Sequence, residues 1–166
     1  MNATLTTPHN QTIKILIWAL TIYIAIIFIQ SLFFKFTNSP ETQYIFGTLN
    51  TWGASQGFSG LFAPSGIFSQ YVVGSTELIA SALLLIGLFM GWPLFHSAGA
   101  LLSMGVISGA IFFHLFTPLG VAVRNTDGSS DGGELFALAC GVWISAAVIL
   151  FVRRQFLLER FRAWQT

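Results

Sequence analysis

The stretch that decides the fold is Tyr71–Met90, YVVGSTELIASALLLIGLFM, which is apolar at most positions and long enough to cross a bilayer as one helix. It holds one charged residue, Glu77, about two turns inside the run. An ionised carboxylate at the centre of a membrane costs about 2.5–3.5 kcal/mol, and less near the edge, so it needs a partner. We therefore take this stretch as a membrane-spanning helix and search for the group that Glu77 meets.

The composition of the whole chain points to lipid as its main solvent. Of the 166 residues, 54% are hydrophobic and 8% are charged, and the mean hydropathy is +0.75. Soluble domains carry about 25% charged residues. The length suits a single domain over residues 1–166, and the formal net charge of +1 gives no reason to expect a nucleic-acid partner. Cys140 is the single cysteine, so it cannot form an internal disulfide.

Four apolar runs are long enough to span a membrane as helices, the form in which backbone groups in hydrocarbon are satisfied within the segment. They are Ile13–Phe36, Gln70–Met90, Pro93–Phe116 and Glu134–Val152. The first run is too long for a secretory signal and no small-residue cleavage site follows it, so we expect it to remain in the mature protein. The sequence thus predicts an all-α, integral membrane four-helix bundle.

The distribution of lysine and arginine gives the expected orientation. Four spans place both termini on one side, and that side holds Lys14, Arg153, Arg154, Arg160 and Arg162. The other side has only two such cations, beside four acids. The positive-inside rule then predicts a bacterial inner-membrane protein with both termini in the cytoplasm. The arginine-rich stretch after Val152 is expected to lie on the anionic inner leaflet.

The connection Thr37–Ser69 is long, faces outward in this topology, and is expected to carry structure of its own. Ser39, Pro40 and Glu41 form a helix-start signal: a capping hydroxyl, a proline at the first helical position and an acid in the first turn. We expect a short interfacial helix here, followed by an apolar loop folded against the bundle. The other outer connection, Thr117–Gly133, is polar and turn-rich.

Every span contributes one ionisable side chain to the outer third of the bundle, and we predict that the four line a ligand site: Lys35, Glu77, His114 and Glu134. Each has a structural alternative. The lysine would snorkel to the headgroups, Glu134 would only start a helix, and His114 would bond a backbone carbonyl. A Lys35–Glu77 ion pair would then serve only to hold the bundle together.

Helical spacing gives the expected inward faces as stripes of small and polar residues. The stripes are Thr21, Ile24, Phe28, Ser31 and Lys35 in the first span; Gly74, Glu77 and Ser81 in the second; and His96, Ala100, Ser103, Ile107, Ala110 and His114 in the third. Two glycine pairs have the spacing that lets helices approach closely, Gly87 with Gly91 and Gly105 with Gly109.

Metal and haem chemistry has weak support. His96 and His114 lie about 27 Å apart along one helix, so they cannot ligate the same haem. One histidine with two glutamates is a conceivable metal set, but nothing in the spacing requires it. We predict no metal site and disfavour haem.

Short motifs along residues 32–154 resemble the DoxX-like membrane proteins. They include FKFT at 34–37, Glu77-Leu78 before LLLIG at 83–87, GAIFFHL at 109–115 and Asp131-Gly132-Gly133. The resemblance implies a four-helix membrane bundle with recurring polar positions at Lys35, Glu77 and His114. It also implies, as in some relatives, an association with quinone-linked oxidation of sulfur compounds or with membrane redox complexes.

Three functions stay open. The first is a redox-associated membrane subunit in which Lys35, Glu77 and His114 bind a quinone headgroup or small polar ligand, beside a redox partner protein. The second is a structural subunit that docks a partner through the long outer loop. The third is a small-solute or proton pathway, for which few polar residues continue inward. The sequence assigns neither an enzyme reaction nor an oligomeric state.

Overall fold

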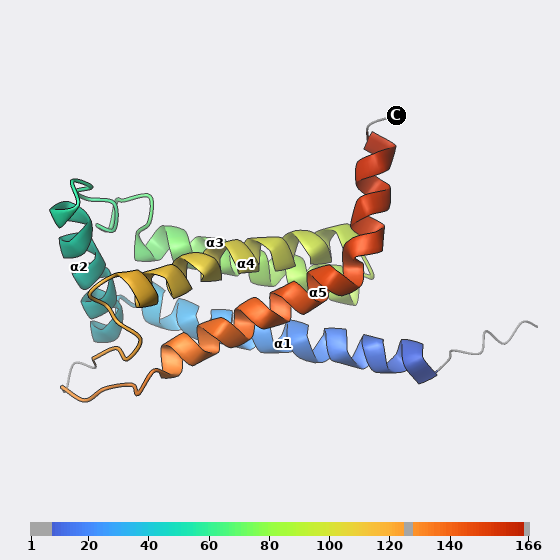
Figure 1. Ribbon diagram of the computed structural model, residues 1–166, viewed down its shortest axis with the longest axis horizontal. Coiled ribbons are helices and arrows are strands. Elements are labelled where there is room, and N and C mark those ends of the chain that lie inside the picture. Colours follow the sequence, from blue (N-terminus) through green and yellow to red (C-terminus); the bar gives the residue numbers. More distant parts are fainter. Residues whose placement is uncertain (1–7, 125–127, 165–166) are drawn as a thin grey trace, which may run out of the picture.

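The computed structural model describes residues 8–124 and 128–164. Its helices run in the order α1 (Pro8–Phe36), α2 (Pro40–Ser55), α3 (Gln70–Phe89), α4 (Pro93–Phe116) and α5 (Glu134–Trp164) (Figure 1). All but α2 are long and apolar enough to cross a membrane, which makes four candidate spans. The predicted all-α membrane bundle of four helices is confirmed.

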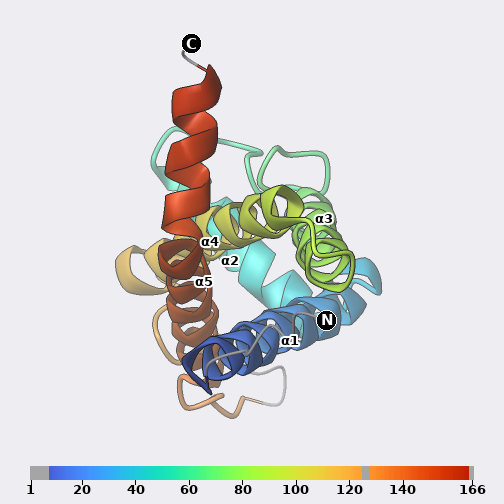
Figure 2. The ribbon, with the colours of Figure 1, turned by 90° about the vertical axis from the view of Figure 1, so that its right-hand side faces the viewer.

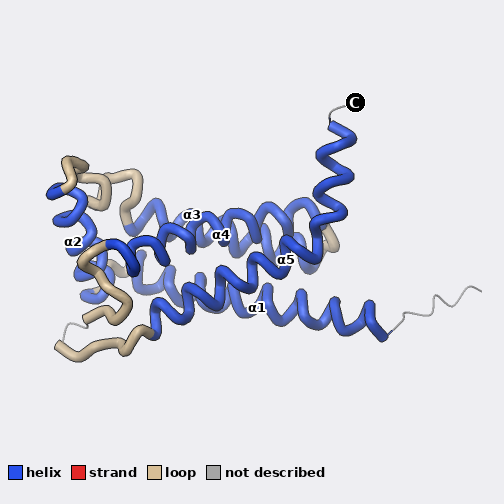
Figure 3. The backbone as a smooth tube through the Cα atoms, viewed as in Figure 1, coloured by secondary structure: helices blue, strands red, loops and turns tan. Residues whose placement is uncertain are grey.

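The four long helices lie side by side, and α2 crosses one end of them. α1 packs against α3 and α5, and α4 packs against the same two neighbours, so the four form a ring when seen end-on (Figure 2). The loop that follows α2, residues 56–69, and residues 117–124 and 128–133 of the third connection lie with α2 at one end of the bundle, which we call the loop end (Figure 3). The start of α1, the turn between α3 and α4, and the tail of α5 lie at the opposite, terminal end (Figure 1).

Burial of side chains confirms the predicted inward stripes. Ile24, Phe28 and Leu84 are at most 1% exposed and form the centre of an apolar core shared by all four long helices. Large apolar side chains on the outer faces, by contrast, are exposed; Phe33 and Leu101 are examples. Because such a surface is unfavourable in water and suited to acyl chains, the fold is that of a multi-pass membrane protein.

The predicted start of α2 is also confirmed. The Ser39 hydroxyl accepts a hydrogen bond from the Thr42 N–H at 3.3 Å, and Pro40 is the first helical residue. α2 lies across the loop end, as expected for an interfacial helix (Figure 1). A second, smaller core joins this helix to both connections through Leu49, Phe62, Leu119 and Val123. The apolar loop therefore folds onto the bundle, as predicted.

Asp131 organises the third connection and the start of α5. Its Oδ1 accepts hydrogen bonds from the N–H groups of Val123 at 2.7 Å and Gly133 at 3.0 Å, and its Oδ2 accepts one from Leu135 at 3.2 Å. A carboxylate placed there satisfies N–H groups of the first helical turn that have no partner within the helix. The turn-rich stretch is thus a built structure around one side chain; its residues 125–127 lie outside the described part of the chain.

α5 is longer than the predicted span, which ended at Val152. The helix continues to Trp164, and its last part turns away from the bundle at the terminal end (Figure 1). The physical reason is that the tail RRQFLLERFRAW has no glycine or proline to end a helix and several strong helix formers. This basic amphipathic tail crosses the end of the bundle. A helix that lies on a membrane surface has the same direction.

α3 and α4 meet at two glycines. A Cβ atom on Gly87 would lie 2.3 Å from the backbone N of His96, and one on Gly99 would lie 2.7 Å from the backbone N of Leu84. A Cβ on Gly105 would meet nothing within 4 Å, and one on Gly109 would meet only Phe113 of the same helix, at 4.0 Å. The prediction of close helix contact is therefore correct for Gly87 and wrong, within this chain, for Gly91, Gly105 and Gly109.

Candidate functional site

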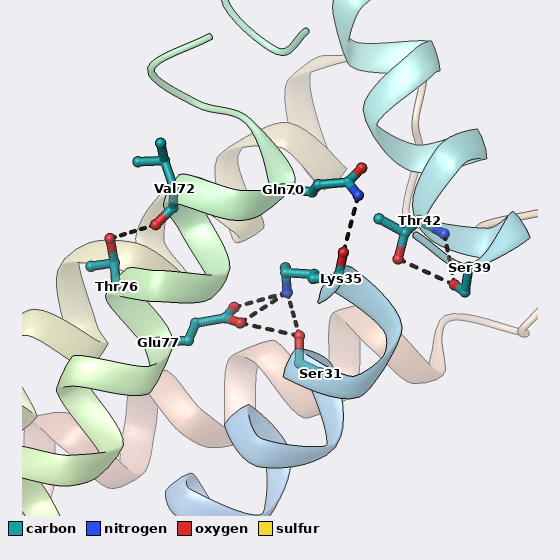
Figure 4. Close-up of polar contacts among 8 residues, drawn as sticks. All are labelled: Ser31, Lys35, Ser39, Thr42, Gln70, Val72, Thr76 and Glu77. Atoms are coloured by element: carbon teal, nitrogen blue, oxygen red, sulfur yellow. Dashed lines mark hydrogen bonds and ion pairs between the residues drawn. The ribbon is translucent and has the colours of Figure 1, made fainter. Parts of the chain in front are cut away.

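The structure brings Lys35 and Glu77 together at the loop end of the bundle. Lys35 Nζ, in the last turn of α1, donates to both carboxylate oxygens of Glu77 on α3, at 3.0 Å each (Figure 4). The Ser31 hydroxyl donates to Glu77 Oε2 at 3.2 Å and also contacts Lys35 Nζ. Glu77 thus finds its predicted partner one helix away, and a hydroxyl one turn from the lysine completes the group.

Local sequence explains why the two side chains reach each other. Gly74 stands one turn before Glu77 on the same face of α3, and the place of its missing Cβ is 3.4 Å from Lys35 Cδ. The lysine stem can therefore lie flat along α3 at this point. Gln70 links the same region: its Nε2 donates to the Lys35 carbonyl at 3.0 Å (Figure 4). It also donates to Asn38 Oδ1 at 2.9 Å.

The pair is almost removed from solvent. The Glu77 side chain is 6% exposed and the Lys35 side chain 14%. Taking two charges out of water costs several kcal/mol each, which close pairing and added hydrogen bonds must offset. Both oxygens of the carboxylate are satisfied here, so the site is stable as a closed ion pair. The ammonium group is the more exposed member of the pair, and it already meets three acceptors, so a ligand that binds it takes the place of one of them.

His114 lies at the same end but is directed elsewhere. Its Nδ1 donates to the Gly120 carbonyl at 2.7 Å, and its ring meets the edge of the Phe136 ring with centroids 5.7 Å apart. A carbonyl only accepts, so the proton is on Nδ1. The alternative in which His114 bonds a backbone carbonyl is the one the structure shows, and the histidine ties the third connection to α4 and α5.

Glu134 also stays apart from the ion pair. It is exposed at the first residue of α5, where its N–H donates to the Asp131 carbonyl at 3.2 Å. An acid in the first helical turn suits the helix dipole, which is the structural alternative given for it. Of the predicted ligand residues, the structure thus joins Lys35 with Glu77 and gives His114 and Glu134 local structural roles.

A second buried polar contact lies near the terminal end and had no role in the sequence prediction. Thr21 Oγ1 and His96 Nε2 are 2.9 Å apart, and both residues are fully buried. Each stands on a predicted inward stripe, so the signal was present. What the spacing alone could not supply was the pairing between α1 and α4.

Among the described residues, no group of three or more histidine, cysteine, aspartate or glutamate side chains is placed to hold a metal ion. Comparison with known proteins finds no matching family model, no matching curated protein and no matching solved structure. Fold and site therefore define the class on their own terms: a multi-pass membrane four-helix bundle with a buried lysine–glutamate pair beside its loop end.

Proposed function

We propose that this chain is a DoxX-like, redox-associated protein of a bacterial inner membrane, with both termini cytoplasmic, that binds a quinone headgroup or small polar ligand at Lys35 and Glu77. One observation carries the proposal: a charged pair is held inside an apolar bundle, yet the Lys35 side chain keeps 14% of its surface exposed. Ionisable residues inside membrane spans are costly and tend to mark functional sites.

The chemistry of the pair suits both redox forms of a quinone. Lys35 Nζ donates to a carbonyl oxygen, and Glu77 accepts from a hydroxyl. Phe36 follows Lys35 in the sequence, and Tyr71 lies at the start of α3. Their rings are stacked with centroids 6.4 Å apart and offer an aromatic wall to a ligand. Reduction of a quinone to a quinol takes two electrons and two protons. In this proposal Glu77 relays protons and a redox partner protein supplies the electrons.

The test is a Glu77→Gln variant of the full chain in nanodiscs, titrated with a short-chain ubiquinone and a short-chain menaquinone analogue. Quenching of tryptophan fluorescence reports binding. Glutamine keeps the size of the side chain and removes its charge, so we expect binding to weaken about tenfold or more, the scale of one charge-assisted hydrogen bond. The matched control is Glu41→Gln, which removes an acid from the first turn of α2; binding there should stay within about twofold. Equal affinity of the wild type and Glu77→Gln would contradict the proposal.

A second candidate is a structural subunit that docks a partner through its outer loop, with the ion pair serving folding alone. The observation that favours it is an open groove of about 580 Å³ over α2, lined by Gln43, Tyr44, Gly47, Thr48, Thr51, Trp52, Ser55 and Pro118. Mixed aromatic and hydroxyl groups of this kind suit a protein partner.

Gly47 offers a direct test of the docking candidate. Gly47 lines the groove, and a Cβ placed on it meets nothing within 4 Å, so we expect the Gly47→Phe side chain to occupy the groove. We expect this variant to lose a partner that co-purifies with the wild type from native membranes, and to keep quinone binding. Gly105→Phe is the control, because Gly105 has equally open space on a different helix. Retention of the partner by Gly47→Phe would remove the groove from consideration.

The interior gives little support to a solute or proton pathway. Ile24, Phe28 and Leu84 fill the bundle between the Thr21–His96 contact and the Lys35–Glu77 pair. The buried hydroxyls of Ser103 and Ser145 in this stretch donate to carbonyls of their own helices, at 2.8 and 2.7 Å, and so do not link the two polar contacts across the apolar core. We therefore do not propose transport.

A further inference from the structure

Three of the five buried polar side-chain atoms that lack a partner among the described residues belong to the terminal end of the bundle; the other two are Asn50 Oδ1 on α2 and Ser81 Oγ on α3. His96 uses Nε2 for its contact with Thr21, which leaves Nδ1 on the other edge of the ring. In the part of the chain that the structure describes, His96 Nδ1, Ser97 Oγ and Arg153 Nε are all buried and have no hydrogen-bond partner. His96 is 0% exposed and Ser97 2%. Buried polar atoms in folded proteins are nearly always satisfied, so these three call for a ligand.

All three groups can donate a hydrogen bond, and their surroundings favour negative charge. Arg153 stands on the part of α5 beyond the outer connection, towards the end where α4 begins, and α5 packs against α4, the helix that carries His96 and Ser97. α4 begins at Pro93 with Trp92 as its N-cap and has no side-chain cap, so the positive end of its dipole is uncompensated. Among the described side chains, the acids stand at the loop end or inside the Lys35–Glu77 pair, away from this cluster.

The depth of the cluster matches the phosphate level of a bilayer. His96 is three residues into α4, or about 4.5 Å along the axis from its first residue. Arg153 follows the apolar run of α5 in the sequence, and the last part of α5 turns away across the terminal end (Figure 1). Lipid phosphates lie just outside the hydrocarbon core, the level at which the ends of membrane-spanning helices stand.

We propose that Arg153, His96 and Ser97 form a phosphate-binding site at the terminal end of the bundle. The phosphate belongs either to an anionic lipid headgroup or to a free phosphate ion. An anionic oxygen accepts from the Arg153 Nε–H and from His96 Nδ1–H, with Thr21 holding the imidazole through its other nitrogen. The site is separate from the Lys35–Glu77 pair, which stands on α1 and α3 at the loop end of the bundle.

The experiment uses the full chain in nanodiscs and has one arm for each source of phosphate. In the first arm, phosphatidylglycerol is titrated into phosphatidylcholine, and native mass spectrometry counts the lipids that each chain retains. In the second arm, the discs contain phosphatidylcholine only, and equilibrium binding of radiolabelled inorganic phosphate is measured. Arg153→Gln should weaken the saturable binding about tenfold in whichever arm shows it, because it removes one charge-assisted contact.

Arg154→Gln is the matched control. It removes the same charge from the next residue, whose guanidinium instead lies 3.9 Å from the Phe151 ring centroid and whose Nη1 donates to the Phe151 carbonyl at 2.8 Å. Binding should change less than about twofold in this variant. His96→Gln serves as the second variant if Arg153→Gln does not fold, and it should weaken binding about threefold or more. Equal losses of binding in Arg153→Gln and Arg154→Gln would show general attraction to a basic surface and would overturn the site. The absence of saturable binding in both arms would overturn it as well.

Discussion

Lys35→Met is expected to lower the free energy of unfolding by about 3–5 kcal/mol, the cost of breaking a buried ion pair from one side. The carboxylate of Glu77 would stay buried in the bundle without its cation. Of its hydrogen bonds described above, the one from the Ser31 hydroxyl would remain. Unfolding of the purified protein in mixed micelles with increasing SDS measures this change. Lys14→Met is the matched control, since Lys14 is exposed near the start of α1, and it should shift stability by no more than about 0.5 kcal/mol.

The double variant Lys35→Met, Glu77→Leu should recover most of that loss and unfold within about 1–2 kcal/mol of the wild type. Replacing both members of a buried pair by apolar groups of similar size is often close to neutral, because no uncompensated charge remains. A double variant as unstable as the single one would contradict the view that the loss comes from a stranded charge. A Lys35→Met protein with the same free energy of unfolding as the wild type would also contradict it.

The same double variant separates the two candidate functions. If the pair only supports folding, the stable double variant keeps the partner that the wild type binds and keeps any cellular activity. If the pair is a ligand site, the variant folds and loses quinone binding, because neither the donor at Lys35 nor the acceptor at Glu77 remains. Stability and binding are thus read from one protein.

The architecture was predictable because its signals are local. Four long apolar runs and the three–four rhythm within them depend on neighbours in the sequence, and burial of Ile24, Phe28 and Leu84 follows that rhythm. The capping signal at Ser39 and Pro40 is equally local. Lys35 and Glu77 could be paired in advance because topology set both at the same depth and each stood on an inward stripe.

The rest of the candidate site depended on how the helices are rotated and on the path of the loops, which spacing does not give. His114 has the predicted depth, but the fold of the third connection presents the Gly120 carbonyl to it at 2.7 Å. Asp131 is a loop residue in sequence, and only the folded chain shows three N–H groups converging on its carboxylate. The continuation of α5 beyond Val152 was missed because the prediction followed the apolar run, which ends there. The residues that follow still have high helix propensity.

Glycine contacts show the same limit most clearly. The pairs Gly87–Gly91 and Gly105–Gly109 have the same spacing, yet the close approach falls at Gly87 and at the unpaired Gly99, while a Cβ on Gly91 or Gly105 would meet nothing within 4 Å. Spacing identifies glycines that permit contact between helices. Which of them makes contact is decided by the rotation of α4 about its axis, and that rotation is set by the apolar stripe through Ala100 and Ile107.

Gly87→Ala should destabilise the protein by about 3 kcal/mol or more, the upper range for overpacking. The added Cβ would lie 2.3 Å from the backbone N of His96 and 2.6 Å from its Cα. These are backbone atoms of a neighbouring helix, so the clash is relieved only by moving α3 and α4 apart along their extensive interface. SDS unfolding in mixed micelles, with size-exclusion chromatography to report folded protein, measures the effect.

Gly105→Ala is the matched control, and its expected effect has the opposite sign. Its Cβ meets nothing within 4 Å, so the substitution only replaces glycine by a better helix former and should raise stability by about 0.5–1 kcal/mol. Both variants add one methyl group to one glycine of a membrane-spanning helix, so composition and mean hydropathy change alike. A difference in sign between them therefore isolates the contact of α3 with α4. If Gly87→Ala and Gly105→Ala have the same free energy of unfolding, α3 and α4 do not approach closely at Gly87.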